Sequence, residues 1–332
     1  MDVFVWIDEE LKPTECTTDE FIYNDMESQS GCQLPIIYQP FDAGKRAHWL
    51  DRGACFDYLA TTGGKRLLDF GPGDGWPSLI VAPYVDEVTG VDASPRRIEV
   101  CCENARRLEI ANANFIRVAP GVPLPFRDGS FDGVMAASSV EQTPDPNKTL
   151  AELYRILRPE GRLRIYYEAL NQYRGGRERE TWLWKISKQI CRLILYNRDI
   201  ERERVRQYAL TFTMSDEELI RHFKGDGLSL AFDMVTIPLI ESARPALTDV
   251  RVCTLIHPSG RTLASWLKEV GFRRVIPTPD GAEIAGQLFD QLAKAKQPED
   301  MNGVDEIVRP AVESAVTEIA PIGDDPMMTA AK

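Results

Sequence analysis

The stretch Leu67-Leu68-Asp69-Phe70-Gly71-Pro72-Gly73-Asp74-Gly75 decides the fold class of this chain. An apolar run that leads into three glycines, spaced two apart, is typical of a buried strand that turns sharply into a helix. Because glycine has no Cβ, the backbone of such a turn can approach a ligand closely, and the helix that follows offers free N–H groups. The stretch therefore predicts a nucleotide-like ligand at this turn.

Short apolar runs alternate with amphipathic stretches on both sides of the turn. The predicted strands are residues 66–70, 87–92, 114–118, 131–137, 162–168 and 272–277, and the predicted helices are residues 42–59, 77–84, 95–109, 148–157, 258–271 and 282–295. Strands that alternate with helices form right-handed crossovers, which build a mostly parallel sheet with helices on both faces. The expected fold class is therefore α/β and Rossmann-like.

The composition excludes several classes of protein. The 332 residues include 51 Asp and Glu against 39 Lys and Arg, so the net charge of −12 disfavours binding to nucleic acid. The seven cysteines contain no CxxC pair, which suggests neither a disulfide framework nor a zinc site and fits a cytoplasmic protein. No signal peptide and no apolar run long enough for a membrane span are recognised.

An acidic residue follows the second predicted strand. Asp92 lies 17 residues after Gly75, where it can accept hydrogen bonds from two ribose hydroxyls. The glycine spacing is GxGxG, whereas a dinucleotide site has GxGxxG. Asp69, just before the turn, suits an ammonium group better than a pyrophosphate. The pair of signals predicts a nucleoside ligand that is not a dinucleotide.

Three further motifs complete a resemblance to a known family. They are LPFRDGSFD at 124–132, VEQTPDP at 140–146 and LYRILRPEG at 153–161. Together with the glycine turn, these motifs resemble the class I S-adenosylmethionine-dependent methyltransferases, in the broad group that includes quinone-biosynthesis C-methyltransferases. The resemblance implies a seven-stranded sheet in which only the last strand is antiparallel. It also implies S-adenosylmethionine as the cofactor and S-adenosylhomocysteine as its product.

The resemblance assigns cofactor contacts to individual residues. The implied cofactor-binding residues are Asp69, Gly71, Pro72, Gly73, Gly75, Asp92, Ala93, Ala119 and Ser138. The glycine turn would hold the methionyl part, Asp92 the ribose, and Ala93 would flank the adenine. One position departs from the family pattern, because Pro120 stands where many members have the Asp that binds the adenine amino group.

Candidate residues for the acceptor side come from the loop after the fourth strand, the end of the fifth strand, the N-terminal segment that the resemblance implies to fold over the cofactor, and the inserted lid. Glu141, Gln142 and Glu168 are the catalytic candidates, and Tyr38, His48, Tyr167 and Trp182 are the candidates for contact with the acceptor. Packing is the competing interpretation for each of them. With three histidines and no HExxH motif, no metal site is expected.

The chain divides into five predicted segments. They are an N-terminal arm with a cofactor-covering helix (1–59), a cofactor-binding core (60–168), an inserted helical cap or substrate lid (169–254), a return to the core (255–295) and a flexible acidic tail (296–332). Residues 155–206 carry a net charge of +7. Within them, residues 182–198 predict a basic amphipathic helix, with its charged side as the solvated face of the lid. A patch for an anionic acceptor and a peripheral contact with a membrane surface are the alternatives.

The predicted function is methyl transfer to a small-molecule acceptor, bulky or lipophilic, by in-line displacement. C- or O-methylation of a metabolite is favoured, because no Asn-Pro-Pro-Tyr-like motif is present. Two alternatives stay open: a non-catalytic module that binds S-adenosylmethionine or a partner, and a less favoured NAD-dependent oxidoreductase. The oligomeric state stays open too.

Overall fold

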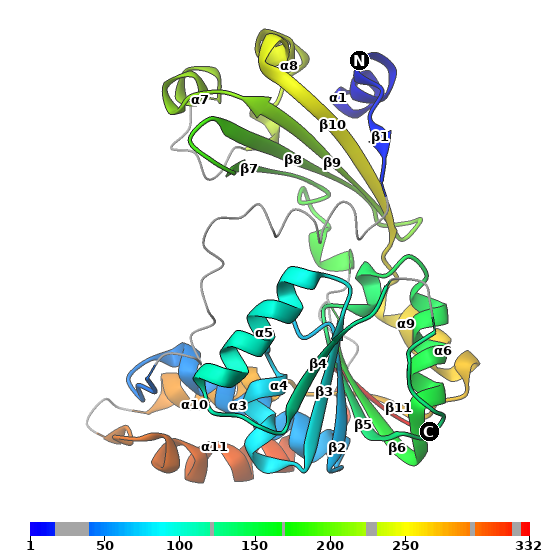
Figure 1. Ribbon diagram of the computed structural model, residues 1–332, viewed down its shortest axis with the longest axis vertical. Helices are drawn as coiled ribbons and strands as arrows, with labels where there is room; N and C mark the ends of the chain where they lie inside the picture. Colours follow the sequence, from blue (N-terminus) through cyan, green and yellow to red (C-terminus); the bar gives the residue numbers. More distant parts are fainter. Residues whose placement is uncertain (17–39, 120–122, 168–169, 224–230, 293–295, 321–326) are drawn as a thin grey trace. The chain divides into compact units, whose positions relative to one another are not determined.

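The computed structural model describes residues 1–16, 40–119, 123–167, 170–223, 231–292, 296–320 and 327–332. The chain divides into two compact units (Figure 1). The smaller unit combines Met1–Cys32 with Leu170–Ser259, and the larger unit combines Gln33–Ala169 with Gly260–Lys332. Both units are therefore built from segments that lie far apart in the sequence.

A seven-stranded sheet forms the centre of the larger unit. Its strands lie in the order β11-β12-β6-β5-β2-β3-β4. Their bounds are β2 Arg66–Phe70, β3 Glu87–Asp92, β4 Ala113–Arg117, β5 Phe131–Ala137, β6 Leu157–Tyr166, β11 Arg273–Thr278 and β12 Met327–Ala331. All neighbours pair in parallel except β12, which is antiparallel to both β6 and β11. This confirms the predicted mostly parallel sheet with an antiparallel last strand.

Helices pack on both faces of this sheet. They are α3 (Arg46–Thr62), α4 (Ser78–Val81), α5 (Pro95–Arg107), α6 (Pro146–Ile156), α9 (Gly260–Val270), α10 (Gly281–Gln291) and α11 (Met301–Ala315). Successive residues of a strand point to opposite faces. Leu68 accordingly belongs to an apolar cluster with Leu153 of α6, whereas Leu67 belongs to one with Tyr58 of α3 and Ile80 of α4. The continuous apolar run of β2 is buried on both sides.

The predicted flexible tail is wrong for the residues that the structure describes. Helix α11 buries Val304, Val308 and Val312 in one apolar cluster with Trp49 and Phe56 of α3. The spacing of four residues places these valines on one face of the helix. Strand β12 then lies between β6 and β11, inside the sheet. The acidic composition of the tail concealed this apolar stripe and the short strand after it.

The smaller unit is a five-stranded sheet with the order β1-β10-β9-β8-β7 (Figure 1). The strands are β1 Thr14–Glu15, β7 Arg179–Lys185, β8 Ile190–Asp199, β9 Arg204–Thr213 and β10 Leu247–Ile256. The helices α1 (Val3–Trp6), α7 (Asp216–Phe223) and α8 (Ile237–Ala243) contribute Phe4, Leu219 and Ile240 to one apolar cluster with its strands. Because β10 lies in this unit, the return to the core begins at Gly260 and not at residue 255.

The predicted helical cap and the predicted basic helix over 182–198 are both wrong. Strands β7 and β8 pair as an antiparallel hairpin through this range, with Trp182 opposite Ile194. Leu193 and Leu195 belong to the apolar cluster on one side of the sheet, and Ile194 belongs to the cluster on the other side. A strand that is buried on both faces has few polar interruptions, so its apolar residues also fit helical spacing.

The basic charge of the insertion is partly balanced by acids from the N-terminal segment. Asp2 forms an ion pair with Arg179 at 2.7 Å, and Asp8 forms one with Arg206 at 2.6 Å. The described part of the predicted arm, residues 1–16, thus belongs to the smaller unit, whereas α3 belongs to the larger unit. The single N-terminal arm expected over 1–59 is therefore divided between the units. Among the described helices, none has the length and apolar character needed to cross a bilayer.

Candidate functional site

The glycine turn lies directly after β2, at the carboxyl end of the parallel strands. Gly71, Gly73 and Gly75 have φ angles of +76°, +61° and +111°, which L side chains rarely adopt. A Cβ on Gly71 would lie 2.5 Å from the Cβ of Ser139, and a Cβ on Gly73 would lie 2.8 Å from Nη1 of Arg97. The turn therefore needs glycine for backbone conformation at all three positions and also for space at Gly71, whereas the end of the Arg97 side chain could move away from a Cβ on Gly73.

Asp69 is a fully buried carboxyl group beside this turn. Its Oδ2 accepts hydrogen bonds from the backbone N–H of Ser78 at 3.1 Å and from the Ser78 hydroxyl at 2.7 Å. Its Oδ1 is buried and has no hydrogen-bond partner in the described structure. Burial raises the pKa of Asp69 to about 7, against the opposing effect of the Ser78 hydrogen bonds. A cationic donor placed at Oδ1 would satisfy this atom and favour the carboxylate.

Asp92 ends β3 and is 7% exposed. Its Oδ1 accepts a hydrogen bond from the backbone N–H of Ser94 at 2.9 Å. Burial raises its pKa, while the backbone N–H groups of Ser94, Ala93 and Gly73 act in the opposite direction. The carbonyl oxygen of Ala93 accepts a hydrogen bond from Nε of Arg117 at 3.2 Å. The second acid is thus fixed beside the glycine turn, as the sequence predicts.

The loop after β5 is tied to the ends of two other strands. Ser138 has a φ of 47°, a left-handed conformation that is uncommon outside glycine, and its N–H donates to the carbonyl of Tyr166 at 3.1 Å. The hydroxyl of Ser139 donates to the carbonyl of Phe70 at 2.6 Å. The amide of Gln142 donates to the carbonyl of Ser138 at 2.7 Å. These bonds bring the carboxyl ends of β2, β5 and β6 together and give Gln142 a role in holding the loop.

His48 lies near the start of α3 and is 1% exposed. Its Nδ1 accepts a hydrogen bond from the backbone N–H of Asp42 at 2.8 Å, and its buried Nε2 has no partner within the described ranges. Burial is the main reason why its pKa is lowered, so the ring is neutral at pH 7. Three residues later on the helix, Oδ1 of Asp51 accepts a hydrogen bond from Nε1 of Trp76 at 3.0 Å. The chain directly after Gly75 is thereby attached to α3.

The other predicted site residues are distributed as follows. Glu141 is 4% exposed in the helical turn Val140–Gln142, and Tyr167 is completely buried after β6. Ala119 is exposed, and Trp182 is 41% exposed on β7 of the smaller unit. Tyr38, Pro120 and Glu168 lie outside the described residues. The larger unit thus brings the cofactor candidates to one edge of its sheet.

Sequence reasoning missed two polar residues that shape this edge. Ser78 satisfies one oxygen of Asp69, and Asp51 attaches Trp76 to α3. Ser78 is the first residue of α4, but its hydroxyl donates to Asp69 and does not cap the helix, so no capping pattern marks it in the sequence. Asp51 carries no such signal except its helical spacing from His48.

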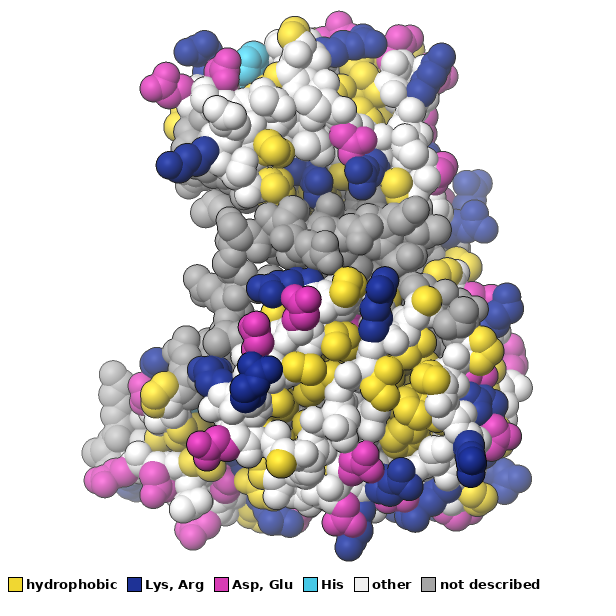
Figure 2. Space-filling view, viewed as in Figure 1, with side chains coloured by type: hydrophobic (Ala, Val, Ile, Leu, Met, Phe, Trp, Pro, Cys, Tyr) yellow, Lys and Arg dark blue, Asp and Glu magenta, His cyan; other side chains and the backbone are white. Residues whose placement is uncertain are grey.

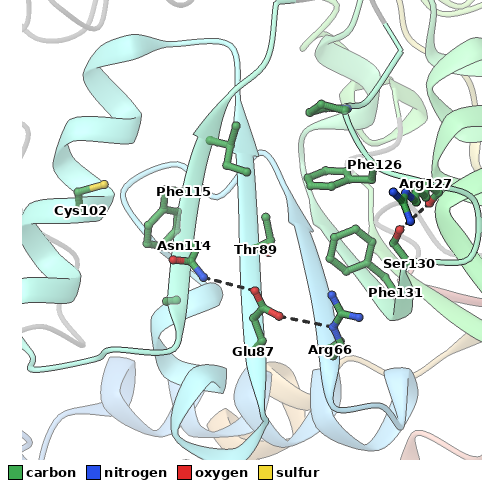
Figure 3. A pocket seen from close by; sticks show the side chains of 13 residues that line it. Arg66, Glu87, Thr89, Cys102, Asn114, Phe115, Phe126, Arg127, Ser130 and Phe131 are labelled. Atoms are coloured by element: carbon green, nitrogen blue, oxygen red, sulfur yellow. Dashed lines mark hydrogen bonds and ion pairs between the residues drawn. The ribbon is translucent and has the colours of Figure 1, made fainter.

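A shallow depression of about 640 Å³ lies elsewhere on the larger unit (Figure 3). Its lining residues are Arg66, Glu87, Thr89, Cys102, Ala113, Asn114, Phe115, Ile116, Pro125, Phe126, Arg127, Ser130 and Phe131. Figure 2 shows hydrophobic side chains gathered on the face of the larger unit that is turned to the viewer. Because Arg66 and Glu87 begin β2 and β3, the depression extends toward the amino ends of the strands. None of the predicted site residues lines it.

Comparison with known proteins identifies the segment that carries the site. Residues 68–165 match the family model described as "Methyltransferase domain". The chain is 34% identical over 108 residues to 27-O-demethylrifamycin SV methyltransferase of Amycolatopsis mediterranei, and this match covers 32% of the chain and 40% of that protein. It is 35% identical over 117 residues to demethylmenaquinone methyltransferase of Tropheryma whipplei, covering 35% of the chain and 46% of that protein.

A solved methyltransferase from Clostridium acetobutylicum superposes with a TM-score of 0.46 at 10% identity, over 69% of this chain and 83% of that one. Both curated relatives are matched over less than half of their own length. The matched segment contains Asp69, the glycine turn, Asp92 and the loop after β5. Residues 68–165 are therefore similar in sequence to methyltransferase domains.

Proposed function

We propose that this chain is an S-adenosylmethionine-dependent methyltransferase that methylates a small-molecule acceptor, bulky or lipophilic, by in-line displacement. The observation that carries the proposal is the buried Oδ1 of Asp69, which has no partner among the described residues, beside a turn in which a Cβ on Gly71 would collide with Ser139. The names of two relatives support the acceptor class, since demethylrifamycin and demethylmenaquinone are both bulky small molecules. C- or O-methylation fits both names.

The residues present fit the cofactor that the family implies. When bound, S-adenosylmethionine supplies a methyl group activated by a positively charged sulfur. Oδ1 of Asp69 is the acceptor that would hold the ammonium of the methionyl part, and Asp92 would accept hydrogen bonds from the ribose hydroxyls. Ala93 and the Ala119 backbone would flank the adenine, and Ser138 would lie near the sulfur.

On the acceptor side, the chain has little chemistry to perform beyond orienting the acceptor and excluding water. Glu141 is the described carboxylate nearest in sequence to the strained Ser138, and it is buried. We assign it to accept a proton or a hydrogen bond from the acceptor. Glu168 remains a catalytic candidate by this proposal, and Tyr38 and Tyr167 remain acceptor-binding candidates.

Thermal unfolding tests the cofactor half of the proposal. S-adenosylmethionine and S-adenosylhomocysteine should each stabilise the protein, and NAD should not. A ligand at 100 times its dissociation constant adds about 2.7 kcal/mol to the folded state, which is a shift of a few degrees for a chain of this size. Stabilisation by NAD alone would favour the oxidoreductase and overturn the proposal.

Turnover of an acceptor tests the methyl-transfer half of the proposal. The protein is incubated with S-adenosylmethionine and a panel of quinols, phenols and polyketide-like hydroxyl compounds, and release of S-adenosylhomocysteine is measured. Release that depends on one of these acceptors and falls in Glu141→Gln supports the proposal. Tight cofactor binding without release for any acceptor would favour the non-catalytic module.

A further inference from the structure

The imidazole of His48 presents a hydrogen-bond donor that nothing in the described structure uses. Nδ1 accepts the Asp42 N–H at 2.8 Å, so the proton of the neutral ring must lie on Nε2. Nε2 is completely buried and has no hydrogen-bond partner in the part of the chain that the structure describes. A buried N–H without an acceptor is costly, and proteins seldom keep one without a use.

The position of His48 relates this donor to the glycine turn. Residues three apart on a helix are neighbours, with Cβ atoms roughly 5–6 Å apart, so His48 lies beside Asp51 on α3. Asp51 accepts the indole N–H of Trp76, the residue directly after Gly75. One turn further along α3, the thiol of Cys55 contacts the carbonyl of Ile80 in α4. The helix face that carries His48 is therefore the face that packs against the segment following the glycine turn.

Oδ1 of Asp69 and Nε2 of His48 are thus both buried without a hydrogen-bond partner in the described structure, as is the hydroxyl of Tyr58 on the same helix as His48. The carboxylate oxygen and the ring N–H have opposite character. Oδ1 of Asp69 can only accept from a donor when the carboxyl group is ionised, and Nε2 of His48 can only donate. An α-amino acid group needs this combination, since its ammonium donates and its carboxylate accepts. The amino-acid end of S-adenosylmethionine is such a zwitterion.

We propose that His48 is a cofactor-binding residue whose Nε2–H donates a hydrogen bond to the carboxylate of the methionyl group, opposite the contact of its ammonium with Asp69. The inference rests on the proposed function, because it deepens the assignment of the same site. It moves His48 from the acceptor side, where the sequence places it, to the cofactor side. The Asp42 N–H is then a positioning contact, because it fixes the tautomer that donates.

Two ligands and two substitutions at one position test this assignment by calorimetry. S-adenosylhomocysteine carries the amino-acid group, whereas 5′-methylthioadenosine has the same nucleoside and sulfur without it. His48→Asn places an amide oxygen near Nδ1, where it can still accept the Asp42 N–H, but it has no group at Nε2. His48→Gln reaches to the Nε2 position with an amide N–H. His222→Asn, in the smaller unit, is the matched control.

We expect His48→Asn to weaken S-adenosylhomocysteine binding at least tenfold, equivalent to 1.4 kcal/mol, while 5′-methylthioadenosine binds as it does to the unaltered protein. His48→Gln should retain most of the affinity, and His222→Asn all of it. Equal loss of both ligands in His48→Asn would show a role in folding or packing and overturn the assignment. Unchanged S-adenosylhomocysteine affinity would overturn it as well.

Nitrogen-15 NMR of the unaltered protein gives a second readout, which stays informative if His48→Asn does not fold. With three histidines in the chain, the side-chain signals are few. S-adenosylhomocysteine should move the Nε2 resonance of His48, and 5′-methylthioadenosine should leave it in place. Movement with both ligands would contradict a contact with the carboxylate. If the unaltered protein binds neither ligand, the proposed function fails first and is distinguished from a failure at His48.

Discussion

Replacing Gly71 with alanine should destabilise the larger unit by two separate effects. Gly71 has a φ of +76°, and placing an L side chain in the left-handed region costs about 1–2 kcal/mol. The new Cβ would also lie 2.5 Å from the Cβ of Ser139, and relief of such overpacking costs about 1–3 kcal/mol. The expected loss in the free energy of unfolding is therefore about 2–5 kcal/mol. Urea unfolding measures it, followed by tryptophan fluorescence.

Gly129 provides the matched control in the same unit. Its φ is +68°, but a Cβ there would meet nothing closer than the Cα of Arg158 at 3.6 Å, an ordinary contact. Gly129→Ala should therefore cost only the conformational part, about 1–2 kcal/mol. The transition of the larger unit is identified as the one that S-adenosylhomocysteine shifts.

A double-mutant cycle with Ser139→Gly separates the clash from the backbone strain. Ser139→Gly alone loses the hydrogen bond to the Phe70 carbonyl, about 1 kcal/mol, but it removes the atom that the new Cβ would meet. In that background, Gly71→Ala should cost about as much as Gly129→Ala. The same cost in both backgrounds would refute the collision, and a cost below that of Gly129→Ala would refute the strained conformation.

Four further predictions follow from the buried charges and from the last strand. Because the pKa of Asp69 is raised to about 7, the folded protein keeps a proton that the unfolded chain releases above about pH 4. The free energy of unfolding without cofactor should therefore fall as the pH rises from 4 to 7. Asp69→Asn should flatten this fall when it is measured by urea unfolding. S-adenosylhomocysteine affinity should rise up to about pH 7 and then level off in calorimetry, because the ammonium group needs the ionised Asp69; an affinity independent of pH would contradict this contact. The ion pair between Asp57 and Arg164, at 2.6 Å, is completely buried, so Asp57→Asn and Arg164→Met should each lower the free energy of unfolding by about 3–5 kcal/mol in the same assay. Lys65→Met, at an exposed ion pair, should lower it by less than about 1 kcal/mol. Deleting residues 327–332 removes β12 from between β6 and β11 and should make the larger unit sensitive to limited proteolysis, while an unchanged digestion pattern would contradict its place in the sheet.

The parallel part of the sheet in the larger unit could be predicted from the sequence, because its signals are local. Strands β2, β3 and β5 have the predicted bounds, since each is an apolar run that ends at a glycine, an acid or a serine. The tail could not be predicted in this way. Strand β12 is five residues long, and its position depends on pairing with β6, more than 150 residues earlier in the chain.

The smaller unit shows where periodicity alone misleads. Strand β8 is buried on both faces near its centre, where Leu193, Ile194 and Leu195 are all at most 1% exposed. A strand of this kind has no alternation of polar and apolar residues that would separate it from a helix. The short segment Ser187-Lys188-Gln189 between β7 and β8 was the available hint of a hairpin, because polar residues there interrupt two runs rich in aromatic and branched side chains.

Whether a residue of the candidate site could be predicted also depends on whether its signal is local in the sequence or arises from tertiary packing. Asp69, the glycines and Asp92 could be predicted because each stands at a fixed distance from a strand end, and the parallel sheet brings those ends to one edge. The hydrogen-bond donor of His48 could not be predicted, because Asp42 sets the tautomer of the ring and the packing of α3 buries it. A family motif therefore identifies the residues whose positions are set by their distance from a strand end. The residues that complete the recognition of a ligand become visible only when unpaired buried atoms can be identified in the structure.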